Sequence, residues 1–194
     1  VARRIVDEAN RLGVSEIVIS ECGHAYASYR WDVPNWFAGE FNFKVRSLIE
    51  VLAEYIADGR ITVDPSAIPE SVTYHDSCNL ARNGGLIEEP RYVLKSIVKD
   101  FREMTPNRDA ALCCGGGGGL LTDELLDLRV KGALPRMEAL QAVVAAHGVN
   151  FMATICAICK AQFTKVLPYY GFKMGMVGGV HQLVSTAIRL GPKT

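Results

Sequence analysis

The stretch His147-Gly148-Val149-Asn150-Phe151-Met152-Ala153-Thr154-Ile155-Cys156 decides the fold of this chain. It follows a helical pattern, and it contains a Gly-Val pair, a short apolar run and then a cysteine. The same order occurs earlier, as Leu12-Gly13-Val14, then Ile17-Val18-Ile19, then Cys22. A glycine after a helix, followed by an apolar strand, is typical of an alternating helix and strand unit. Its recurrence predicts an internal repeat, present here as one and a half copies.

Around this stretch, helical and strand patterns alternate along the chain. Apolar residues recur at helical spacing within residues 2–9, 45–56, 94–101 and 122–146. In the last of these helices, Gly132 and Pro135 predict a break or a kink. Short strand-type runs occupy residues 16–20, 71–75, 149–154 and 173–177. The alternation predicts an α/β fold with largely parallel strands flanked by helices.

The repeat predicts two pseudo-symmetric cysteine-rich lobes, of which the first is only partly present. Residues 1–65 are interpreted as the remnant of a first repeat that retains Cys22 alone, and residues 66–194 as a complete repeat. Half of a pseudo-twofold unit cannot cover its own sheet. Apolar or strand-edge surface is therefore expected to be exposed on the first lobe.

Composition narrows the class of protein. The chain has 194 residues, 49% of them hydrophobic and 22% charged, which is enough for one core or two small lobes. Its formal net charge of zero disfavours nucleic acid and anionic membrane surfaces as partners. No apolar run approaches the roughly 20 residues of a membrane helix, so direct membrane insertion is not expected. Six cysteines without an export signal indicate a reducing, cytoplasmic compartment in which the thiols are free to bind metal.

Five of the cysteines are expected to meet in space. Cys78 is followed by the adjacent pair Cys113 and Cys114, and then by Cys156 and Cys159. All five fall where strands give way to loops, and such loops gather at the carboxyl ends of parallel strands. Soft thiolates select zinc, copper(I) or iron–sulfur clusters, and five of them exceed the four that one tetrahedral ion uses. We predict a metal centre on these cysteines, with a redox-active iron–sulfur cluster favoured and zinc as the alternative.

A run of five glycines follows the cysteine pair. We expect Gly115, Gly116 and Gly117 to help bind the cluster, because main-chain N–H groups without side chains can approach its sulfides closely. A linker or a phosphate-binding loop is the alternative, although no Gly-Lys-Ser/Thr follows the run. The cysteines have alternatives of their own, since a lone buried cysteine is often a small hydrophobe and Cys-x-x-Cys can be a dithiol redox pair.

Other polar residues near the cysteines are weaker candidates. His75 is a candidate catalytic residue that donates a hydrogen bond to cluster sulfur or a proton to a leaving thiolate, or it is simply a strand-end residue. His24, beside Cys22, is expected to be structural or to support the metal site from outside the ligand set. Positive charge near an anionic cluster is a possible role for three side chains that are otherwise surface groups: Arg82, Lys160 and Lys165.

The cysteine pattern resembles that of a known family. The order Cys78, Cys113-Cys114-Gly115 and Cys156-x-x-Cys159, with its flanking segment from Tyr74 to Arg82, is similar to the cysteine-rich CCG domain of heterodisulfide reductase catalytic subunits. The spacer before Cys156 is somewhat longer than the usual pattern. The segment Glu21 to Tyr26, with the aromatic residues after it, looks most like the HdrD-like subunits DsrK, HmcF and TmcB of sulfate-reducer membrane complexes.

This resemblance implies a cofactor, an activity and partners. It implies a noncubane [4Fe-4S] cluster on the five cysteines, which would also be the catalytic residues of an oxidoreductase that reduces, or reversibly oxidises, a sulfur–sulfur bond. The implied substrate is a DsrC-type sulfur carrier protein of sulfate respiration. The implied partners are ferredoxin-like clusters and a membrane cytochrome subunit, which would hold the chain at the inner face of the cytoplasmic membrane. The alternatives are a CCG subunit of a lactate or glycolate oxidation complex, and a non-catalytic electron-transfer or zinc-stabilised scaffold subunit.

An aromatic cluster bears on how a substrate would reach the site. About half of these residues are expected in the core, and those beside Cys22 on a loop at the cluster mouth, where they would grip an inserted peptide terminus. The residues concerned are Tyr26, Tyr29, Trp31, Trp36, Phe37, Phe41 and Phe43.

Overall fold

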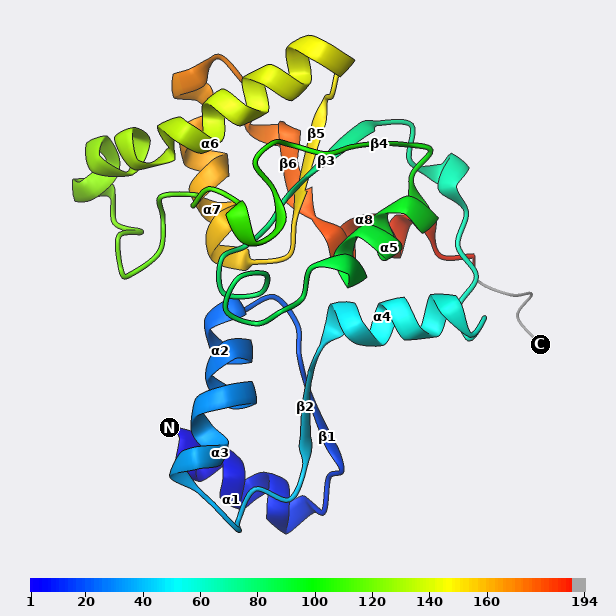
Figure 1. Cartoon of the computed structure of the whole chain (residues 1–194), viewed down its shortest axis with the longest axis vertical. Coiled ribbons are helices and arrows are strands. Elements are labelled where there is room, and N and C mark those ends of the chain that lie inside the picture. Colours follow the sequence, from blue (N-terminus) through cyan, green and yellow to red (C-terminus); the bar gives the residue numbers. More distant parts are fainter. Residues whose placement is uncertain (190–194) are drawn as a thin grey trace.

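Two parallel sheets occupy the two ends of the computed structural model, which describes residues 1–189 (Figure 1). The predicted α/β class, with parallel strands flanked by helices, is confirmed. Residues 190–194 of the predicted second repeat lie outside the described part. Within residues 1–189, no helix has both the length and the apolar composition needed to cross a membrane.

The first lobe contains a two-stranded parallel sheet and short helices. In chain order its elements are α1 (Ala2–Leu12), β1 (Glu16–Ile19), α2 (Gly23–Ala27), a π-helical turn (Ser28–Asp32), α3 (Val33–Trp36) and β2 (Lys44–Ser47). Ile17 of β1 lies opposite Val45 of β2. Helix α1 ends as the sequence predicts, because Gly13 adopts the left-handed conformation with φ of 63°.

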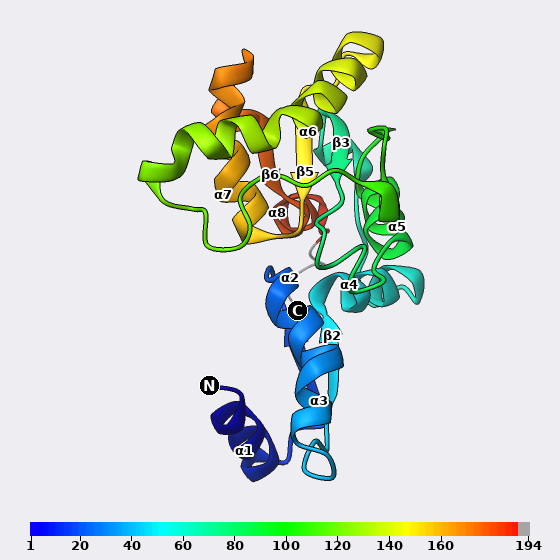
Figure 2. The same cartoon turned by 60° about the vertical axis from the view of Figure 1, so that its left-hand side comes forward.

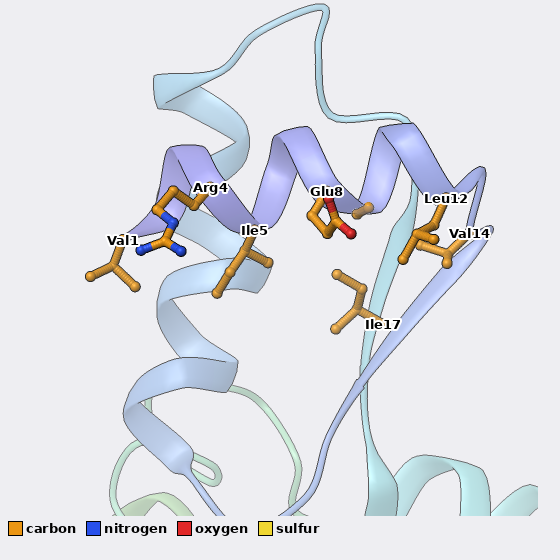
Figure 3. A pocket seen from close by; sticks show the side chains of 8 residues that line it. Val1, Arg4, Ile5, Glu8, Leu12, Val14 and Ile17 are labelled. Atoms are coloured by element: carbon orange, nitrogen blue, oxygen red, sulfur yellow. The ribbon is translucent and has the colours of Figure 1, made fainter.

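An apolar hollow of about 660 Å³ lies between α1 and β1 (Figure 3). Its lining residues are Val1, Arg4, Ile5, Glu8, Ala9, Leu12, Val14 and Ile17. Leu12 is 59% exposed, and within the described residues β1 and β2 pair only with each other. The exposed apolar surface and free strand edge expected for the first lobe are therefore present.

Helix α4 (Leu48–Ala57) connects the first lobe to the second. Ser47 caps it, since its hydroxyl accepts a hydrogen bond from the N–H of Ile49 and its own N–H donates to Glu50 at 2.6 Å. The helix predicted from residue 45 therefore starts three residues too early. Val45 belongs instead to β2, where pairing with β1 overrides the helical periodicity.

The second lobe has a four-stranded parallel sheet in the order β4-β3-β5-β6. Its strands are β3 (Ser71–His75), β4 (Asp100–Arg102), β5 (Phe151–Thr154) and β6 (Val177–Gly179). Its helices are α5 (Glu88–Ile97), α6 (Leu126–His147), α7 (Ala157–Val166) and α8 (Val180–Ala187), with 3₁₀ turns at residues 65–67, 108–110, 123–125, 167–170 and 174–176. Helices α6 and α7 cover one face of the sheet, and α5 and α8 cover the other (Figures 1 and 2).

Three predicted boundaries in this lobe are wrong. The helix predicted over 94–101 ends at Ile97, and Phe101 lies in β4 because the extended backbone from Val98 onward pairs with β3. The strand predicted over 173–177 is displaced to β6, since residues 174–176 form a 3₁₀ turn. Helix α6 runs without a break through Gly132 and Pro135.

A buried ion pair fixes the loop that leaves β3. Arg91 of α5 is 1% exposed, and its guanidinium donates two hydrogen bonds of 2.8 Å to the carboxylate of Asp76. Asp76 also accepts from the N–H of Arg108 at 2.8 Å. Arg91 reaches the partly exposed Glu103 as well. The contacts hold Asp76, and with it the start of the Cys78 loop, against α5.

Candidate metal centre

Two neighbouring strand ends carry three of the predicted ligands. Strands β3 and β5 are adjacent and parallel, with His75 opposite Thr154, so the loops that follow them leave the same edge of the sheet. A contact of 3.1 Å between the hydroxyls of Ser77 and Thr154 ties these ends together. The β3 loop carries Cys78, and the β5 loop leads to the cysteines at the start of α7. This is the arrangement that a parallel sheet predicts.

One small cavity, of about 20 Å³, brings the five thiols together. Its lining residues are His24, Ser77, Cys78, Asn79, Cys113, Cys114, Gly117, Cys156, Ile158 and Cys159. All five cysteines are free thiols, so the predicted convergence is present and no disulfide competes with it. The cavity is small because the thiols contact one another across it, and metal binding requires these contacts to be exchanged for bonds to metal.

Hydrogen bonds among the thiols divide them into two kinds. Bonds from Cys114 and Cys78 hold the pKa of Cys113 far below its usual range, while the same contact and burial raise that of Cys78 well above it. Hydrogen bonding to Cys113 raises the pKa of Cys114 to about 11. A bond from Cys159, with neighbouring backbone N–H groups, lowers the pKa of Cys156 to about 5, and Cys159 is raised well above its ordinary value. The metal-free site therefore already holds thiolates, the form that binds metal.

Gly115 is required for the loop to pack on α6. Its φ is +80°, and a β-carbon there would lie 2.7 Å from the carbonyl carbon of Gly132. Gly132, which the sequence marks as a helix breaker, is thus the place where α6 admits the loop. The N–H of Gly115 donates to the sulfur of Cys113 at 3.3 Å, as expected for main-chain groups directed at the site.

Gly116 and Gly117 have different surroundings. A β-carbon on Gly116 would lie 2.7 Å from the side chain of Gln162 on α7, which itself donates to the carbonyl of Cys114 at 3.1 Å. A β-carbon on Gly117 would meet nothing within 4 Å, and this glycine lines the thiol cavity. Of the three glycines predicted to bind a cofactor, two are explained by packing and only Gly117 borders the cavity.

We expect Gly115→Ala to lower the free energy of unfolding much more than Gly118→Ala. Both positions have positive φ, so each variant bears left-handed strain of about 1–2 kcal/mol. Only Gly115→Ala also clashes with α6, which adds overpacking of about 1–3 kcal/mol. Urea denaturation of the two variants measures the difference, and equal losses would show that the contact with α6 is not tight.

His75 lies at the back of the thiol group. It is 1% exposed, its ring meets Phe163 edge-on at 4.7 Å, and one of its nitrogens lies within 4.8 Å of the sulfurs of Cys114 and Cys159. Neither ring nitrogen has a hydrogen-bond partner among the described residues. Burial and the nearby Arg136 hold the pKa of His75 well below its usual range, so the imidazole is neutral. An unpartnered neutral imidazole can bind metal or donate to sulfur, and its predicted catalytic role stays a prediction.

The first lobe contributes one loop to the site. The carbonyl of Glu21 accepts a hydrogen bond of 2.8 Å from the N–H of Ala157, in the Cys-x-x-Cys turn. Its carboxylate lies 3.3 Å from Lys160 and 3.4 Å from the ring of His181. A β-carbon on Gly23 would lie 3.1 Å from Asn79, so the two lobes approach closely here. Figure 1 shows the start of α2 meeting the loops of the second lobe.

Cys22 and His24 differ in their relation to the cavity. The sulfur of Cys22 accepts a hydrogen bond from the N–H of Ala25 at 3.4 Å, which makes it the cap of α2, and Cys22 is not among the cavity residues. His24 does line the cavity. The loop of the first repeat therefore presents an imidazole, and not its cysteine, to the thiols.

The surface cations proposed from the sequence have other partners. Arg82 donates to the carbonyls of Asp109 and Ala111, and Lys165 lies 3.6 Å from Asp123. The cation that does lie behind the thiols is Arg136 of α6, which was not predicted from the sequence. Its signal was a charged residue among the apolar positions of a helix, beside Ala133, Met137 and Leu140.

The aromatic segment is helical, so the prediction that it forms a loop is wrong. Tyr26 is buried in α2, and the rings of Phe41 and Phe43 stack with centroids 4.2 Å apart. Trp31 lies in the π-helical turn and is 51% exposed. It lines an open hollow of about 520 Å³ together with His24, Ala27, Ser28, Asp32, Asn79 and Asn83. His24 and Asn79 line both this hollow and the thiol cavity, so the two are neighbours.

The donor set fits an iron–sulfur cluster better than a single ion. Five thiols and an adjacent unpartnered imidazole exceed the four ligands of tetrahedral zinc. The N–H groups of Gly115 and Gly116 are directed at sulfur, as in sites that stabilise anionic clusters.

Known proteins share this pattern. The model of the cysteine-rich domain family CCG matches residues 72–164. Over 95% of its length, the chain is 37% identical to the Hdr-like menaquinol oxidoreductase iron–sulfur subunit 2 of Archaeoglobus fulgidus, of which it covers 39%. Over 82%, it is 32% identical to one subunit of the dihydromethanophenazine:CoB–CoM heterodisulfide reductase of Methanosarcina mazei, of which it covers 38%. The EtfAB:quinone oxidoreductase of Syntrophomonas wolfei is 33% identical over 59% of the chain.

The chain thus spans about two fifths of the length of the first two relatives. These likenesses confirm the resemblance drawn from the cysteine spacing.

Proposed function

Because residues 72–164 belong to the cysteine-rich CCG domain family, we propose that this chain is an iron–sulfur subunit of a heterodisulfide-reductase-like oxidoreductase. The observation that carries the proposal is the meeting of five free thiols, from three separate loops, around one cavity. Cys78, Cys113, Cys114, Cys156 and Cys159 are the proposed ligands. A noncubane [4Fe-4S] cluster is the proposed cofactor.

The proposed reaction is cleavage of a sulfur–sulfur bond to two thiols, which consumes two electrons and two protons, or its reverse. The bound cluster would supply or accept the electrons singly. His24 lines both the cavity and the hollow, and it is therefore placed to deliver a proton to a leaving thiolate. Asn79 shares that wall and has an amide to orient the substrate. The buried, neutral His75 is proposed to donate a hydrogen bond to sulfur from behind.

The hollow favours a neutral, peptide-borne substrate over a small carboxylate. Neither lysine nor arginine lines it, and its one carboxylate is Asp32. A hydroxy acid would need a cation to pair with its carboxylate. The amides of Asn79 and Asn83, bonded to each other at 2.7 Å, have further donors and acceptors for a peptide backbone. These features support a sulfur carrier protein with a flexible arm over the lactate or glycolate alternative.

The larger assembly is also a proposal. The relatives are named as quinol, quinone or dihydromethanophenazine oxidoreductases and reductases, which supports electron exchange with a membrane carrier through partner subunits. We propose ferredoxin-like clusters and a membrane cytochrome subunit as those partners, with the chain peripheral on the inner face of the cytoplasmic membrane. Residues 1–65 are proposed to be the remnant of a first repeat, and residues 66–194 the complete one.

The function is tested by mixing the cluster-loaded chain with a sulfur carrier protein in its disulfide form, and separately with lactate and glycolate. The carrier should perturb the cluster spectrum, and removal of its cysteine-bearing arm should abolish the response. Trp31→Ala should weaken carrier binding about tenfold or more, because aromatic side chains dominate binding energy where they line a contact. Trp36→Ala is the matched control, since this exposed tryptophan of the same segment does not line the hollow. A response to the hydroxy acids alone would favour the other oxidation complex.

A further inference from the structure

A second buried charge lies behind the cysteine pair. Arg136 of α6 is fully buried, yet its guanidinium has only neutral acceptors. It donates to the carbonyl of Leu112 through Nε and Nη2, both at 3.2 Å, to the carbonyl of Pro106 at 3.2 Å, and to the sulfur of Met104 at 3.6 Å. Among the described residues, no carboxylate oxygen lies within 4.0 Å of it, whereas the buried Arg91 has two such partners.

A buried cation without an anion is strongly disfavoured, so some negative charge must compensate Arg136. Asp76 is near enough to act on it, but this carboxylate is already bonded to Arg91 and to the N–H of Arg108. The remaining negative groups near Arg136 are the predicted ligands. Burial lowers the pKa of Arg136, and negative charge on Asp76, Cys113, Cys114 and Cys159 opposes that shift.

The contact with Leu112 places the guanidinium next to the ligands. Leu112 immediately precedes Cys113, so two donors of Arg136 hold the backbone on which the cysteine pair begins. Helix α6 brings this charge from a long distance in sequence, on a face otherwise occupied by the buried Ala133, Met137 and Leu140. A leucine or methionine would suit those surroundings better, unless a negative site lies opposite.

We infer that Arg136 is a positioning residue that supplies the buried counter-charge for the thiolates and for the anionic cluster they hold. This inference rests on the proposed function, because the cluster is its object. Reduction adds negative charge to a cluster, and a fixed cation nearby stabilises the reduced form more than the oxidised form. Arg136 therefore raises the reduction potential of the site in addition to ordering the cysteine loop.

The test is a redox titration of the full chain reconstituted with iron and sulfide, in four forms. Arg136→Gln removes the charge and keeps a donor for Leu112, while Arg136→Lys keeps the charge. We expect Arg136→Gln to lower the one-electron reduction equilibrium about tenfold, or about 59 mV, and Arg136→Lys to restore most of it. The matched control is Arg129→Gln. Arg129 is also buried on α6 but bonds to Gln162 at 2.8 Å and the carbonyl of Thr122 at 3.0 Å. Its potential should remain that of the parent chain.

An Arg136→Gln chain with the parent potential would overturn the inference, and so would an equal shift in Arg129→Gln. If Arg136→Gln takes up no iron, Arg136→Lys decides: uptake with a near-parental potential supports the counter-charge. If neither variant takes up iron, Arg136 serves only as a backbone clamp and the inference is wrong. Failure of the parent chain to bind iron and sulfide is a different result, because it would overturn the proposed function itself and the inference with it.

Discussion

The Cys156→Ser chain is expected to assemble no iron–sulfur cluster. Cys156 is the thiol at the start of α7 with a pKa lowered to about 5, so it is a thiolate before metal arrives. A serine hydroxyl is a hard and weakly acidic ligand, and it cannot replace thiolate on iron. Iron, acid-labile sulfide and visible absorbance should fall to background after anaerobic reconstitution. The same outcome is expected for serine at Cys113, Cys114 or Cys159.

Cys22→Ser is the matched control for this series. Cys22 is an exposed thiol on the loop of the first lobe, and its sulfur caps α2 without lining the thiol cavity. Serine is itself a good helix cap, so this variant should keep its iron and its fold. Loss of the cluster in Cys22→Ser, with retention in Cys156→Ser, would reverse the assignment of the ligands.

The second large effect is on stability. Asp76→Asn should lower the free energy of unfolding by about 3–5 kcal/mol, because it leaves Arg91 buried without its main counter-ion. The side chains of both residues are almost fully buried, and two hydrogen bonds of 2.8 Å join them. Urea denaturation of the metal-free chain measures the loss without a contribution from bound metal.

Glu103→Gln is the control, because it removes the other carboxylate of the same arginine. The side chain of Glu103 is 29% exposed, so this change should cost about 0–1 kcal/mol. If the two variants lost equal stability, the account of Asp76 as the buried anchor of the Cys78 loop would be wrong. Because Asp76 lies two residues before Cys78, Asp76→Asn should also weaken cluster retention.

The sequence predicts the strand ends that form the site better than it predicts the sheet edges. Strands β3 and β5 follow apolar runs that are buried on both sides, and their positions place Cys78 and Cys156 at one edge. By contrast, β2 and β4 are short edge strands inside stretches with helical periodicity. Their conformation depends on pairing with a distant strand, which no local pattern records.

The cysteine loop shows the same limit. Five glycines indicate that the backbone needs freedom, but only the structure shows that Gly115 faces Gly132 and Gly116 faces Gln162. Arg136 was missed because helical residues facing the core are expected to be apolar, and a buried cation is explained only by the charges brought near it in space. Local pattern identifies candidate ligands, whereas the groups that orient them and balance their charge come from other elements.

The central claim is that the five-cysteine cavity holds an iron–sulfur cluster. The most direct measurement is metal and sulfide analysis of the full chain after anaerobic reconstitution, combined with its paramagnetic resonance spectrum. Our account predicts iron and acid-labile sulfide in equal amounts, with a paramagnetic signal that is lost in Cys156→Ser. Zinc bound at the five cysteines, with neither iron nor sulfide, would contradict it.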